Sequence, residues 1–260
     1  MKVPLSIRVI PAFTWRAWIT PPPVGSKTLL RDQEATADLT SFLAGEVTGF
    51  EVGSGPLVLA LHGWGGRPAQ MAPIARRLAD EGFRVVIPEL PGRAGGEPTD
   101  IKKVAAVIRH LIDQIGVPEV VVAHSFASMV MRLVFSDEGP RLAVLVAPSL
   151  DVHDALEAFG DRLRLLPWAR SGLRKRLESF DPNLWPTMAA VQVDHMSPTE
   201  IMLVHDPEDD DTPFARSAEL AALRPSASIA AVSGVGHSRI LSDPAALEQI
   251  ADFVGARVGG

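Results

Sequence analysis

Apolar residues follow two alternating rhythms from residue 57 onward. Short continuous apolar runs, which are typical of strands buried on both faces, occur at Leu57–Leu61, Phe83–Ile87, Val120–Ala123, Leu142–Ala147, Ile201–Val204 and Ser228–Val232. Amphipathic segments, which indicate helices, occur at Pro68–Glu81, Thr99–Ile115, Phe126–Phe135, Pro213–Leu223 and Pro244–Val254. Residues 1–260 are therefore expected to form one α/β domain, with a mostly parallel central sheet and helices on both faces.

The first 37 residues lack this rhythm and are expected to form an N-terminal extension. The first 25 are predicted to be irregular, and they contain Phe13, Trp15, Trp18 and the extended stretch Pro21–Pro23. The three aromatic side chains could cap the core or form a partner surface, and core capping is favoured because exposed aromatic residues without a partner are costly. A helix capped by Ser26 is predicted to run to Thr36, and two antiparallel strands are predicted within residues 38–52.

The rhythm is interrupted at residues 148–198, which contain helical patterns and no comparable apolar strand. One predicted helix face is formed by Leu156, Phe159, Leu163 and Leu166. We expect this segment to be a small helical cap inserted into the α/β domain. Four of its apolar residues could either line a pocket or form the core of the cap: Trp168, Phe180, Trp185 and Met196.

Composition narrows the function classes. The 260 residues are 47% hydrophobic, with a net charge of −6, so the basic excess of a nucleic-acid-binding protein is missing. The chain contains no cysteine, which excludes disulfides, thiolate metal sites and a cysteine nucleophile. It has no uninterrupted apolar run of about 18 residues and no signal-peptide pattern, so a cytoplasmic protein without a membrane span is expected.

Candidate chemistry lies in four loops that follow predicted strands, where open α/β sheets place their sites. Ser125 is at the tip of a strand–turn–helix, between the small residues Ala123 and Ala127. A glycine-rich loop follows Leu61, an acidic loop follows Val204, and a Gly-x-Gly-His sequence follows Val232. They span His62–Gly66, His205–Pro213 and Gly234–Leu241.

From about residue 57 to its end, the chain resembles the α/β-hydrolase superfamily, in particular esterase-like members with an H-G-W-G-G loop and a G-x-G-H near the C-terminus. In that superfamily the catalytic residues follow the order serine, acid, histidine. The resemblance implies that Ser125 is the nucleophile and His237 the general base. It places the acid four residues before a proline, which selects Asp209, with Asp206 as the alternative.

The same resemblance implies an oxyanion hole formed by two backbone amides, those of Trp64 in the glycine-rich loop and Phe126 after the nucleophile. Relatives that need a carboxylate or cysteine nucleophile are excluded, because position 125 is serine and the chain has no cysteine. No cofactor and no metal are expected. The acidic loop could bind a cation weakly, but no second group of ligands has suitable spacing.

The expected function is that of a serine hydrolase that cleaves carboxylic esters or related small acyl compounds through an acyl-enzyme. Thioesterase, lactonase and carbon–carbon hydrolase activities remain open, because they can use the same three residues. A catalytically inactive hydrolase fold that serves as an interaction protein is a further alternative, since a fold alone does not establish a function. All three candidate residues are present here, however, whereas inactive relatives usually lose one.

Overall fold

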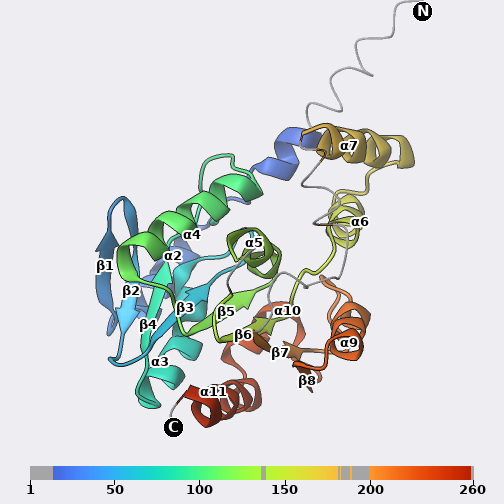
Figure 1. The fold of residues 1–260 in the computed structure, drawn as a ribbon. Helices are drawn as coiled ribbons and strands as arrows, with labels where there is room; N and C mark the ends of the chain where they lie inside the picture. Colours follow the sequence, from blue (N-terminus) through green and yellow to red (C-terminus); the bar gives the residue numbers. More distant parts are fainter. Residues whose placement is uncertain (1–13, 136–138, 181, 183–187, 189–198, 259–260) are drawn as a thin grey trace, which may run out of the picture.

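A computed structural model describes residues 14–135, 139–180, 182, 188 and 199–258. Its eight strands form one sheet in the order β1-β2-β4-β3-β5-β6-β7-β8 (Figure 1). The strands are β1 (Thr40–Ala44), β2 (Val47–Val52), β3 (Leu57–Leu61), β4 (Arg84–Pro88), β5 (Val120–His124), β6 (Leu142–Val146), β7 (Glu200–His205) and β8 (Ala227–Ala231). β2 is antiparallel to both of its neighbours, and all other neighbouring pairs are parallel. The predicted mostly parallel sheet is confirmed.

Both faces of the sheet are covered by helices. The helices are α2 (Ser26–Ala35), α3 (Ala72–Asp80), α4 (Ile101–Ile115), α5 (Phe126–Val134), α6 (Val152–Arg162), α7 (Pro167–Phe180), α9 (Phe214–Leu223), α10 (Gly236–Arg239) and α11 (Pro244–Val258), with short 3-10 turns η1 (Pro68–Met71) and η3 (Ile240–Ser242). In β3, Val58 and Ala60 pack into the core under α3 and α11, whereas Leu59 and Leu61 pack into the core under α4 and α5. This two-sided burial explains why the central strands are continuous apolar runs.

The N-terminal part of the chain differs from its prediction. Residues 14–19 are helical, whereas the sequence analysis predicted irregular structure there. The prediction missed them because a stretch of six residues is too short to show the periodicity of a helix. The cap of α2 is Gly25, and Ser26 is already inside the helix. The helix predicted to begin at Thr99 is α4, which begins at Ile101 and is capped by Asp100, whose side chain accepts a hydrogen bond from the backbone N–H of Lys103 (3.1 Å).

Two helices, α6 and α7, lie between β6 and β7 in sequence and apart from the helices that cover the two faces of the sheet (Figure 1). Leu156 is buried as predicted, but Leu163 and Leu166 are 43% and 60% exposed. The prediction of one continuous face is wrong because α6 ends at Arg162 and Arg164 has a φ of 52°, which reverses the chain and breaks the helical phase. In the described ranges, no helix has the length and apolar character needed to cross a bilayer.

Candidate active site

Ser125 forms the turn between β5 and α5. Its backbone has a φ of 52° and a ψ of −121°, a conformation that costs about 1–3 kcal/mol in a residue other than glycine. The turn is held by hydrogen bonds from Ser125 N to Val146 O (3.0 Å) and from Ser149 N to Ser125 O (3.1 Å). A Cβ at Gly63 would lie 3.0 Å from the Ser125 Cβ, which is tighter than ordinary van der Waals contact, so a side chain at this position of the neighbouring loop would crowd the turn. The hydroxyl is thereby presented at a cavity.

His237 lies in α10 and contacts both other candidate residues. Its Nε2 is 2.9 Å from Ser125 Oγ, and its Nδ1 is 2.8 Å from Asp209 Oδ2. An ionised carboxylate only accepts hydrogen bonds, so Nδ1 carries the proton and Nε2 is left to accept the serine hydroxyl. The backbone carbonyl of His237 also accepts a hydrogen bond from His124 Nε2 (3.0 Å), which fixes the loop.

The side chain of Asp209 is fully buried and accepts hydrogen bonds on both carboxylate oxygens. Oδ2 accepts from His237, from His205 Nε2 (3.2 Å) and from Thr212 Oγ1 (3.0 Å). Oδ1 accepts from the backbone N–H groups of Asp211 (2.7 Å) and Thr212 (3.0 Å). Burial acts to raise the pKa of Asp209, but the hydrogen bonds from His205 and His237 outweigh it, so the pKa lies well below its usual range.

Asp206, the alternative acid, has a different environment. Its Oδ2 accepts hydrogen bonds from the backbone N–H groups of Val235 (2.7 Å) and Gly236 (2.6 Å), and its Oδ1 accepts one from Glu208 N (2.9 Å). These backbone donors, that of Gly236 above all, lower the pKa of Asp206. Asp206 therefore connects the acidic loop to the segment Gly234–Leu241, which contains His237. Asp209 is the carboxylate that accepts the hydrogen bond from the His237 imidazole.

The glycine-rich loop brings Trp64 beside the residue that follows Ser125. The rings of Trp64 and Phe126 pack edge to face, with centroids 5.4 Å apart and an interplanar angle of 71°. Within the described residues, neither backbone N–H of this pair has a hydrogen-bond acceptor. Both amides are therefore available to a ligand, and their role as an oxyanion hole stays a prediction.

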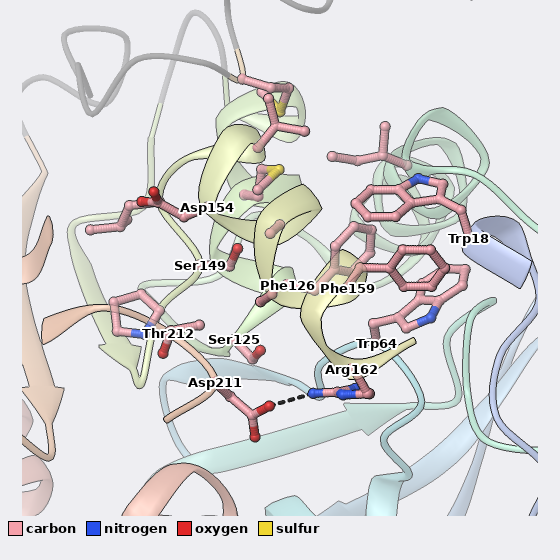
Figure 2. Close-up of a pocket in the computed structure, with 18 of the residues that line it drawn as sticks. Trp18, Trp64, Ser125, Phe126, Ser149, Asp154, Phe159, Arg162, Asp211 and Thr212 are labelled. Carbon is pink, nitrogen blue, oxygen red and sulfur yellow. Dashed lines mark hydrogen bonds and ion pairs between the residues drawn. The ribbon is translucent and has the colours of Figure 1, made fainter. Parts of the chain in front are cut away.

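A cavity of about 360 Å³ opens beside Ser125 and His237. Figure 2 shows the rings of Trp18, Phe159 and Trp64 on one side of Ser125, with Asp154 on the other. Asp154 is paired with Arg216 of α9 (2.6 Å). One wall of the cavity is thus aromatic and the opposite wall carries paired charges.

The aromatic lining only partly follows the sequence interpretation. Trp168 is 47% exposed and does not line the cavity, whereas Trp15 and Trp18 of the N-terminal segment do. These two residues neither cap the core under the sheet nor form a separate surface. Phe13, Trp185 and Met196 lie outside the described residues, and the same holds for the side chain of Phe180. Trp15 and Trp18 are more than a hundred residues from Ser125 in the sequence, so no local pattern predicts that they line its cavity.

Comparison with known proteins assigns the family. The sequence profile of the alpha/beta hydrolase family matches residues 57–250. The chain belongs to this family. No match is found among curated protein sequences.

Solved structures share the fold of this α/β hydrolase at low sequence identity. An esterase from Pyrococcus furiosus has a TM-score of 0.65 and 16% identity, covering 93% of this chain and 98% of its own. A membrane phospholipase A, described as a bacterial virulence factor, has a TM-score of 0.64 and 16% identity, covering 97% and 94%. Est1E from Butyrivibrio proteoclasticus has a TM-score of 0.62 and 12% identity, covering 85% and 99%.

One residue of the hydrolase site was missed by the sequence interpretation. His205 ends β7, is completely buried, and donates a hydrogen bond from Nε2 to Asp209; its Nδ1 accepts one from Ser217 Oγ (2.8 Å). In the sequence analysis His205 is only the first residue of the acidic loop His205–Pro213 and is given no role. His205 and Asp209 are four positions apart, and the turn between them brings the Asp209 carboxylate to the His205 imidazole. That spacing is the feature of the sequence that could have identified the contact.

Two other histidines, His62 and His124, have structural roles in the hydrolase fold. His62 donates from Nδ1 to Gly63 O (2.9 Å) and accepts from Leu90 N at Nε2 (3.2 Å), which fixes the glycine-rich loop. Burial lowers the pKa of His62 to about 4 and the pKa of His124 to about 3. Both side chains are therefore neutral at pH 7.

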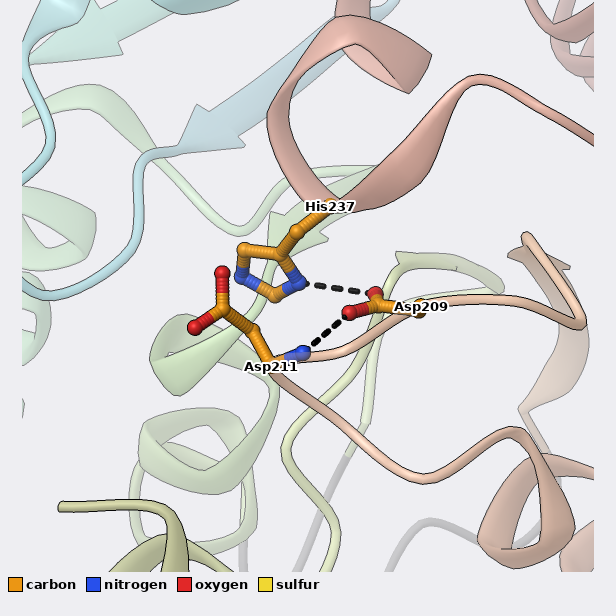
Figure 3. Close-up of side chains that lie close together, drawn as sticks. All are labelled: Asp209, Asp211 and His237. Carbon is orange, nitrogen blue, oxygen red and sulfur yellow. Dashed lines mark hydrogen bonds and ion pairs between the residues drawn. The ribbon is translucent and has the colours of Figure 1, made fainter. Parts of the chain in front are cut away.

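A candidate set of metal ligands overlaps the same residues. Asp209, Asp211 and His237 each place one ligand atom within 4.8 Å of the others (Figure 3). His237 Nδ1, however, donates its proton to Asp209, and the Asp211 carboxylate is paired with Arg162 of α6. These hydrogen bonds and ion pairs satisfy the three groups without a cation, so the arrangement suits proton transfer better than metal binding.

Proposed function

We propose that this hydrolase is a serine esterase that cleaves carboxylic esters or related small acyl compounds. Ser125 is the nucleophile, His237 the general base, and Asp209 the acid that orients the imidazole. The observation that carries the proposal is the unbroken chain of contacts from Ser125 Oγ to His237 Nε2 (2.9 Å) and from His237 Nδ1 to Asp209 Oδ2 (2.8 Å). This is the arrangement of a nucleophile, a base and an orienting carboxylate.

The reaction begins when Ser125 Oγ attacks the acyl carbon and its proton passes to His237 Nε2. Asp209 stabilises the imidazolium that forms. The negative oxygen of the tetrahedral intermediate is bound by the amides of Trp64 and Phe126, each of which supplies about 3 kcal/mol of transition-state stabilisation in comparable enzymes. Collapse releases the alcohol, which takes the proton from His237, and water repeats the sequence to free the acid.

We further propose that residues 148–198 act as a cap over the site. Phe159 and Arg162 of α6 line the cavity, and the pairing of Arg162 with Asp211 connects α6 to the acidic loop. A cap of this kind excludes water from the acyl group and shapes the space that the substrate occupies. We propose the same domain organisation as the sequence analysis: one domain, with an N-terminal extension at residues 1–37 and this cap.

A fluorophosphonate probe tests the nucleophile. Wild-type protein should gain one probe mass in intact-mass analysis, and Ser125→Ala should gain none. Ser128→Ala is the matched control, because Ser128 is a buried serine three residues further on whose hydroxyl bonds to Ala123 O (3.2 Å). It should label like wild type. Absence of labelling of the folded wild-type protein would contradict the proposal and favour an inactive interaction protein.

A further inference from the structure

Aromatic side chains are concentrated at the cavity. The chain has ten Phe, five Trp and no Tyr, and five of these fifteen residues are among the 27 described residues that line it: Trp15, Trp18, Trp64, Phe126 and Phe159. The lining residues are thus about a tenth of the chain, but they include a third of its aromatic residues. Aliphatic side chains would bury the same apolar area, so burial alone does not account for this choice of side chains.

The rings are arranged as two edge-to-face pairs. Trp18 packs on Phe159 with centroids 5.0 Å apart at 85°, and Trp64 packs on Phe126 at 5.4 Å and 71°. Figure 2 shows both pairs bordering the same space beside Ser125. Aromatic rings attract one another edge to face through their quadrupoles, beyond the area that they bury. The aromatic ring of a ligand in this space can therefore gain contacts that a saturated ring of the same size cannot.

The wall that carries Trp18 is held in place by several contacts. Ile19 O accepts a hydrogen bond from Thr99 N (2.8 Å), and the Arg176 guanidinium lies 4.8 Å from the centroid of the Trp15 ring. These contacts fix residues 14–19 against α7 and the residue before the cap of α4. Residues 14–19 also lie outside the segment 57–250 that matches the family, so Trp15 and Trp18 are not part of the matched region.

We propose that the cavity is an acyl-binding site selective for aromatic groups, and that Trp18 is its main specificity residue. This inference rests on the proposed esterase function and names its substrate class: arylalkanoyl esters, with the ring between the two aromatic pairs and the carbonyl at Ser125. The volume of about 360 Å³ is in the range of sites that enclose small ligands.

The test compares methyl 3-phenylpropanoate with methyl 3-cyclohexylpropanoate, which differ only in the aromaticity of the ring. Wild-type kcat/KM, followed by acid release, should favour the phenyl ester about tenfold. Trp18→Leu should bring the ratio near one, and Trp18→Phe should keep it. Trp168→Leu, which changes an exposed tryptophan outside the cavity, should leave the ratio unchanged. Thermal unfolding establishes that each variant is folded.

A wild-type ratio near one, or an unchanged ratio in Trp18→Leu, would overturn the inference. Hydrolysis of neither ester would instead count against the proposed esterase function. Calorimetric titration of Ser125→Ala with the same two esters separates the two cases, because it measures binding without turnover. Tighter binding of the phenyl ester supports the aromatic site, and equal affinity for both esters refutes it.

Discussion

At the scale of single residues, the two acids of one loop are expected to have distinct roles. In the proposed mechanism, Asp209→Asn removes the charge that stabilises the imidazolium and disturbs the tautomer of His237, so kcat for a methyl ester should fall by about 10⁴-fold. Asp206→Asn leaves the contacts of Asp209 intact and should lower kcat less than tenfold. Its main effect should be a lower urea midpoint, because Asp206 bonds to Val235 and Gly236. The reverse pattern would transfer the role of acid to Asp206.

His205 is expected to position the Asp209 carboxylate. A hydrogen bond to a charged group contributes about 1.5–3 kcal/mol, and Asp209 retains its other donors, so His205→Leu should lower kcat about tenfold with KM unchanged. His205→Gln keeps an N–H donor and should restore kcat to within about threefold of wild type. Rates are normalised to the fraction of protein that a fluorophosphonate labels, which removes effects of misfolding. Equal kcat values for the Leu and Gln variants would show that the hydrogen bond is not what matters.

At the scale of secondary-structure elements, the sequence predicted the parallel strands to within a residue or two. Strands such as β3 and β5 are buried on both faces, so they consist of continuous apolar residues, a pattern that the loops lack. Helix caps were predicted less well. Thr99 and Asp100 are adjacent polar residues, and only the observed hydrogen bond from Lys103 N identifies the cap.

The candidate site could be predicted where its residues follow strands and could not be predicted where they meet across the fold. Ser125 and His237 stand in loops after strands, in an order that resembles a known family. Trp18 is more than a hundred residues from Ser125, and its pairing with Phe159 depends on how residues 14–19 and α6 pack. No spacing in the sequence encodes such a contact, so only the structure identifies the aromatic wall.

At the scale of the whole molecule, buried neutral histidines should make folding stability depend on pH in the mildly acidic range. His62 and His124 have ordinary pKa values near 6.5 when unfolded, and burial lowers the pKa to about 4 and about 3 in the folded protein. Below pH 6.5 the unfolded chain therefore binds protons that the folded chain excludes. Each histidine should lower the free energy of unfolding by about 1.4 kcal/mol per pH unit between pH 6.5 and its folded pKa.

The carboxylates Asp206 and Asp209 act in a separate window. Their pKa values are lowered in the folded state, so the stability that they contribute is present above about pH 4 and is lost only as the pH falls further. Urea unfolding at pH 7.5, 6.0 and 5.0 should therefore report mainly the histidines. His62→Asn should reduce the slope between pH 6.0 and 5.0 by about half. A wild-type stability that is constant from pH 7.5 to 5.0 would mean that both imidazoles can be protonated without unfolding, which their burial argues against.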